Sequence, residues 1–103
     1  MFQHLQEQYG LYRALVRSQA IDLVWAAMKK RLTEQVEDHF RQVQMKPINN
    51  LVVRVTAQGV VGTFLSLLQW WLENEMPLSP AQMDAYFYQL LLPGVQAMLH
   101  SEA

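Results

Sequence analysis

Few side chains in this sequence could carry out catalytic or metal chemistry, and their spacing is unfavourable for it. A di-iron site on a helix needs a glutamate three residues before a histidine, and the residue three before His39 is Val36. Glu34 and Asp38 stand four residues apart, but like-charged neighbours on a polar helix face are usually solvated. The chain has no cysteine, and its histidines share no metal-binding spacing: His4, His39 and His100. The sequence therefore predicts no metal site.

Nucleophilic and phosphate chemistry lack support as well. The serines stand in no nucleophile motif, and Ser79 is better explained as a helix cap. A glycine-rich phosphate loop requires a preceding strand, and none is predicted. We therefore expect a protein that is not an enzyme, with no catalytic residue and no cofactor.

Length and composition indicate one folded domain over residues 1–103. Hydrophobic residues make up 51% of the chain, and the formal net charge is −1. This balance predicts no nucleic-acid surface on the chain itself. The longest apolar stretch, residues 51–72, includes Arg54, Gln58 and Gln69, which disfavour a membrane span. No secretory signal opens the sequence, so we expect a cytoplasmic protein with no membrane partner.

The hydrophobic periodicity predicts an all-α fold, an antiparallel bundle of about four helices with short connections. Ser18 is predicted to cap the second helix. Ser79 and Gln82 form a capping box, with Pro80 at the first helical position. Pro93 and Gly94 are expected to kink or end the last helix, leaving a short C-terminal turn. The expected helices span residues 2–16, 19–43, 48–74 and 80–92.

The last two predicted helices are apolar on nearly all sides. Their apolar surface is larger than a single chain of this size can cover. Such surface needs a partner, and a second copy of the chain is the simplest one. Gly59 and Gly62 weaken the third helix, and we expect a close neighbour at Gly62.

Residues 57–83, AQGVVGTFLSLLQWWLENEMPLSPAQM, resemble the C-terminal region of TetR-type bacterial transcriptional regulators. The Trp71-Leu72 dipeptide resembles the end of the penultimate helix in one branch of that family. Ser79-Pro80 is similar to the helix start that follows it. Residues 11–15 are also similar to the segment that opens the domain in that family. Glu75 departs from the pattern, because a glycine is common at that position.

The resemblance implies a regulatory domain that lacks the N-terminal helix-turn-helix domain of the family. Two copies would pair through their last two helices as a four-helix bundle. An unknown small-molecule effector would bind among the other helices and change the spacing of the DNA-reading domains. DNA would be a partner only through the missing domain.

Two sets of residues are candidates for these roles, and for each of them plain core packing remains the alternative. Candidates for the ligand pocket are aromatic and other large side chains: Tyr9, Tyr12, Trp25, Met28, His39, Phe40 and Phe64. Candidates for the dimer interface lie on the last two helices: Trp71, Met83, Tyr86, Phe87, Leu90 and Leu91. The alternative for the whole protein is a stand-alone helical homodimeric interaction module with no DNA-binding partner domain.

Overall fold

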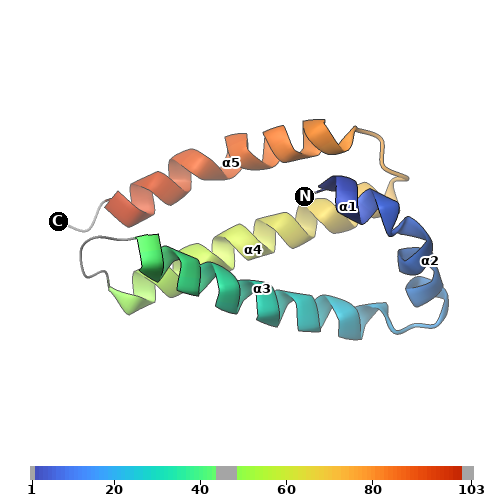
Figure 1. Cartoon of the computed structure of the whole chain (residues 1–103), viewed down its shortest axis with the longest axis horizontal. Coiled ribbons are helices and arrows are strands. Elements are labelled where there is room, and N and C mark those ends of the chain that lie inside the picture. Colours follow the sequence, from blue (N-terminus) through green and yellow to red (C-terminus); the bar gives the residue numbers. More distant parts are fainter. Residues whose placement is uncertain (1, 44–48, 101–103) are drawn as a thin grey trace.

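The computed structural model describes residues 2–43 and 49–100, which form five α-helices and, within those ranges, no strand (Figure 1). This confirms the predicted all-α fold. The predicted start of a helix at residue 48 lies outside the described residues. The helices are α1 (Phe2–Glu7), α2 (Tyr9–Arg17), α3 (Ile21–Val43), α4 (Asn50–Glu73) and α5 (Pro80–His100).

The helices form a thin, elongated slab. Figure 1 shows α4 lying between α3 and α5 in projection, with the short helices α1 and α2 gathered at one end. The principal extents are 48 × 27 × 16 Å, and the radius of gyration is 15.3 Å. A compact chain of this length has a radius of gyration near 13 Å, so much of the helix surface stays outside the core.

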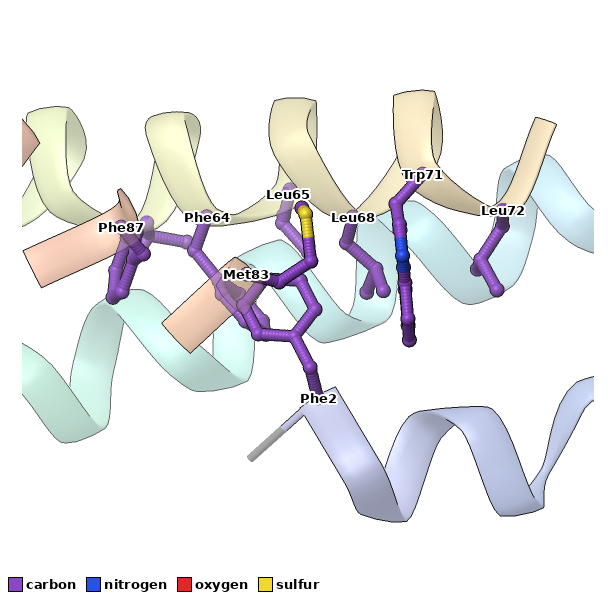
Figure 2. Packing of buried hydrophobic residues seen from close by; sticks show 9 residues of the cluster. Phe2, Phe64, Leu65, Leu68, Trp71, Leu72, Met83 and Phe87 are labelled. Atoms are coloured by element: carbon purple, nitrogen blue, oxygen red, sulfur yellow. The ribbon is translucent and has the colours of Figure 1, made fainter. Parts of the chain in front are cut away.

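The main core lies where α1 enters between α4 and α5 (Figure 2). The Phe2 side chain is fully buried. Its ring packs edge-on against Phe64 and Trp71, with centroid distances of 5.4 and 5.3 Å. The rest of this cluster comes from α4 and α5: Val61, Leu65, Leu68, Leu72, Met83 and Phe87. One aromatic residue therefore fixes the short α1 to both long helices.

A smaller apolar cluster joins the ends of α3 and α5 to the beginning of α4. It contains Phe40, Val53, Ala57 and Leu99. Because Leu99 is buried here, the last turn of α5 is part of the folded core. The burial of Leu99 explains why α5 extends as far as His100.

The predicted helix boundaries at residues 2, 43 and 80 are confirmed, whereas three other predictions about the helices are wrong. The capping box that starts α5 is present, since the Ser79 amide donates to Gln82 Oε1 at 2.9 Å and the Gln82 amide to Ser79 Oγ at 3.1 Å. The second helix does run to Val43. The predicted helix over residues 2–16 is instead two helices that part at Gln8, which has no side-chain cap.

Ser18 and Pro93 behave differently from the prediction. Ser18 is the C-cap of α2, where its hydroxyl donates to the Leu15 carbonyl at 3.0 Å, and it does not cap α3. The last helix does not end at Pro93, because α5 continues to His100. Pro93 is exposed, so water can satisfy the carbonyl group that its missing N–H leaves without a bond.

Helix α4 is long and apolar enough to cross a membrane, with a mean hydropathy of 1.7 over its most apolar stretch. It is also the central helix of the fold, and nine of its residues are buried against the other helices. The core helix of a soluble protein passes the same test of length and apolarity.

Candidate functional site

An apolar cavity of about 200 Å³ lies between α2, α3 and the C-terminal half of α4. Nine of its eleven lining residues are aliphatic, methionine or tryptophan, and Gln8 and Tyr12 supply the polar atoms. The full lining is Leu5, Gln8, Leu11, Tyr12, Leu15, Ile21, Val24, Trp25, Met28, Leu68 and Leu72. The lining suits a small organic ligand, and the volume is below the roughly 300–1,000 Å³ of sites for drug-sized ligands.

Helical spacing places these side chains around one space. Gln8 directly precedes α2, and Leu11, Tyr12 and Leu15 follow within the helix at steps of three or four residues, so that all four share one face. Helix α3 contributes the same spacing from Ile21 to Met28. None of the α2 side chains is buried, although that helix is strongly amphipathic. The apolar face of α2 therefore covers the cavity without filling it.

A second, polar hollow of about 280 Å³ adjoins the cavity between α2 and the end of α4. The two hollows share Tyr12 and Leu72 in their linings. The other residues that line it include two basic and two acidic side chains: Tyr9, Arg13, Val16, Arg17, Glu73 and Glu75. An elongated ligand could occupy both spaces, with its apolar part beneath α2.

The rings of Tyr9, Tyr12 and Trp25 form a continuous series along the two hollows. Tyr9 and Tyr12 are stacked at 5.9 Å, and Tyr12 lies 6.3 Å from Trp25 at an angle of 58°. Burial raises the pKa of the Tyr12 phenol, and the charge of Glu73 and then Tyr9 raise it further. Tyr12 is therefore a neutral phenol at pH 7, able to donate a hydrogen bond to a ligand.

The seven residues predicted to line a pocket separate into two groups. Tyr12, Trp25 and Met28 line the apolar cavity, and Tyr9 lines the adjoining polar hollow. The other three lie elsewhere. Phe64 is in the main core, 5.5 Å from the ring of Phe87, while His39 is exposed and Phe40 belongs to the smaller cluster.

Sequence reasoning missed the aliphatic part of the lining because it looked for aromatic side chains. The available signal was the three- and four-residue spacing on α2 that groups Gln8, Leu11 and Leu15 with Tyr12. The contribution of α4, Leu68 and Leu72, was hidden because the whole of that helix is apolar.

A third apolar surface lies on the opposite side of α4, where it runs beside α5. Its hollow of about 280 Å³ has two glycines in its lining. A Cβ atom added at Gly59, Gly62 or Gly94 would meet nothing within 4 Å. The close neighbour expected at Gly62 is therefore not among the residues that the structure describes. The other lining residues are Val55, Thr56, Val60, Thr63, Leu90, Leu91, Val95 and Met98.

The six residues predicted for a dimer interface have different environments. Trp71, Met83 and Phe87 are buried in the main core of one chain. Tyr86 and Leu90 are exposed, with 46% and 63% of their surface accessible, and Leu91 is half-buried. Only the latter three therefore have surface that a second chain could reach.

Titratable groups are scattered over the rest of the described chain. Within residues 2–43 and 49–100, no three His, Asp or Glu side chains come close enough together to hold a metal ion. The ion pairs described in these ranges join Arg41 to Glu37 and Asp38 on the surface of α3, and Arg41 also donates to Asn50 Oδ1 at 2.6 Å. The two hollows and the face beside α5 are thus the candidate sites.

Comparison with known families now defines the class of this helical domain. Residues 1–92 match a family model described as a transcriptional regulator C-terminal region, of the TetR type. The chain therefore belongs to the C-terminal regions of TetR-type transcriptional regulators. No curated protein and no solved structure matched the chain.

Proposed function

We propose that this chain is the effector-binding and dimerisation domain of a cytoplasmic TetR-type regulator. A small ligand in the cavity beneath α2 would control DNA binding by an N-terminal domain, and two copies would pair through α4 and α5. The observation that carries this proposal is the position of α4. One side of this helix lines the apolar cavity, and another side forms the exposed face beside α5.

Two stripes of side chains support self-association. On α4, Val55, Gly59 and Thr63 follow at steps of four residues, with Trp70 seven residues further on the same side. On α5 the equivalent stripe also has steps of four: Tyr86, Leu90, Gly94 and Met98.

Large apolar residues stand at the ends of both stripes, with a glycine within each. Val55 and Leu90 leave more than half of their surface in contact with water. The glycines give room for a helix of a second copy to approach closely. Two such stripes on a pair of neighbouring helices suit a two-fold contact that joins four helices.

The test of the interface uses two exposed leucines on α5. Leu90 lines the hollow beside α4, whereas Leu92 lies two residues, or about 200°, further round the helix and lines no part of it. Both are at least half exposed. We expect Leu90→Glu to give monomers in light scattering at micromolar concentration, and Leu92→Glu to leave the dimer intact. A monomeric parent chain, or equal behaviour of the two variants, would contradict the proposal.

The ligand function rests on the apolar cavity and on its connection to the exposed face through α4. A ligand shifts an equilibrium only by binding one state better than the other. Leu68 and Leu72 in the cavity are within one turn of Trp70 on the exposed stripe. A change in the position of α4 beneath the ligand would thus also move the interface.

The ligand is sought by screening compounds for those that raise the melting temperature of the chain, since a ligand stabilises the state that binds it. Filling the cavity with Leu68→Trp is expected to abolish such a shift, and Leu92→Trp, on the surface of α5, is the control. Because the chain has a net charge of −1, we expect no specific DNA binding without the N-terminal domain. A specific gel shift by the 103 residues alone would overturn that part.

A further inference from the structure

We infer that the ligand of this domain is an organic cation, with its apolar body in the cavity beneath α2 and its positive charge beside Glu73. This inference rests on the proposed ligand function and adds the chemical class of the ligand. It follows from the way in which the charges that line the polar hollow are already compensated within the chain.

The two basic side chains of the hollow each have a local role. The guanidinium of Arg13 lies over the ring of Tyr9, 6.0 Å from its centroid, in a cation–π contact. Arg17 is in the last turn of α2, where a cation compensates the partial negative charge of the helix end. Each of these two cations therefore has a favourable contact within the chain.

The two carboxylates that line the polar hollow, Glu73 and Glu75, have no comparable contact within the described chain. Glu73 is the last residue of α4, a helix of 24 residues with no basic residue in its last turn. Its carboxylate adds negative charge at the negative end of the helix, where a carboxylate is unfavourable. In the part of the chain that the structure describes, the carboxylates of Glu73 and Glu75 have no ion pair or hydrogen bond. A ligand cation would compensate this charge.

The negative charge lies at the junction of the two hollows. Glu73 lines the polar hollow, and its charge acts on the phenol of Tyr12, which lines both spaces. The rings of Tyr12 and Trp25, whose centroids are 6.3 Å apart, line the apolar side of the same junction. Aromatic faces attract cations and also pack against apolar groups. A ligand with a ring and an ammonium group would therefore contact the aromatic rings and Glu73 together.

The experiment uses three probes that share a benzyl group and differ in charge: benzyltrimethylammonium, benzyl alcohol and phenylacetate. Binding to the whole 103-residue chain is measured by calorimetry. We expect the cation to bind about tenfold more tightly than the alcohol, from one ion pair and one cation–π contact. Glu73→Gln is expected to remove this advantage and to leave the affinity for benzyl alcohol unchanged. Glu34→Gln, an exposed change on α3 outside both hollows, should behave as the parent.

Other outcomes would overturn the inference. If benzyl alcohol or phenylacetate binds as tightly as the cation, or if Glu73→Gln retains the preference, the ligand is not selected as a cation at this place. The cavity would remain a ligand site in those cases, because at least one probe still binds. If no probe binds, the inference is wrong. The proposed ligand function is tested separately by the melting-temperature screen, and it fails only if that screen finds no ligand either.

Discussion

The indole Nε1 of Trp71 donates a hydrogen bond of 2.8 Å to the carbonyl oxygen of Leu78. Trp71 is fully buried in the main core, near the end of α4, and Leu78 lies in the turn that leads to α5. The same ring packs edge-on against Phe2 of α1. One side chain thus connects three segments of the chain, and it determines where α5 begins relative to α4.

Replacing this indole tests that role. Trp71→Phe keeps an aromatic ring in the core but removes the donor, leaving the Leu78 carbonyl without its partner. We expect a loss of about 1–3 kcal/mol in the free energy of unfolding, measured by urea denaturation at one fixed protein concentration. A loss below about 0.5 kcal/mol, the usual size for a surface change, would show that the bond contributes little.

The turn after Trp71 is a Schellman motif with a glutamate at the position that usually holds glycine. The Met76 amide donates to the Trp71 carbonyl at 2.7 Å, and the Glu75 amide donates to the Leu72 carbonyl at 3.2 Å. Glu75 has a φ of 61°, in the left-handed region that favours glycine. This backbone angle explains why a glycine is expected here and what its absence costs.

Glu75→Gly is therefore expected to stabilise the chain. Relief of the left-handed strain should raise the free energy of unfolding by about 1 kcal/mol, seen as a higher melting temperature. Asn74→Gly is the matched control. Asn74 has a φ of −102°, and its side-chain amide donates to the Trp70 carbonyl at 2.8 Å, so a glycine there should destabilise. Destabilisation by Glu75→Gly would contradict this account of the turn.

Phe2 is the buried residue of α1, and it holds this helix against the main core. Phe2→Ala removes a fully buried ring that touches Phe64 and Trp71, and we expect it to cost about 3–5 kcal/mol. Gln3→Ala, an exposed change on the next residue, should stay within about 0.5 kcal/mol of the parent. Urea denaturation of both variants checks this. Equal, small effects would mean that α1 is not held by Phe2.

Local signals predicted the boundaries that local chemistry determines. The capping box at Ser79 and Gln82 was readable because it satisfies amides within one turn. The continuation of α5 past Pro93 was not readable, because it depends on distant contacts. Leu99 packs with Phe40 and Val53, and this burial holds the last turn in place despite the proline.

The candidate site was only partly predictable for a related reason. Trp71 and Leu90 are both apolar residues on helices without a polar side, so the sequence alone does not distinguish core from surface. The structure separates them, since Trp71 is enclosed by α1 and Leu90 is not covered. Tyr12 and Trp25 were predicted together as large aromatic side chains, and the structure places both in the lining of the apolar cavity, with their ring centroids 6.3 Å apart.

The raised pKa of Tyr12 predicts a loss of stability at alkaline pH. Burial and the charge of Glu73 disfavour the ionised phenol of Tyr12 in the folded chain. The folded chain therefore holds the phenol proton more tightly than the unfolded chain does, in which the phenol has its ordinary pKa of 10.0. Stability is therefore intact below that value and falls as the pH rises towards the folded pKa. Tyr12→Phe should remove this part of the fall, measured by urea denaturation from about pH 9 upward. Tyr88→Phe removes an exposed phenol on α5 and is the control. An equal effect of the two variants would show that the fall does not come from Tyr12.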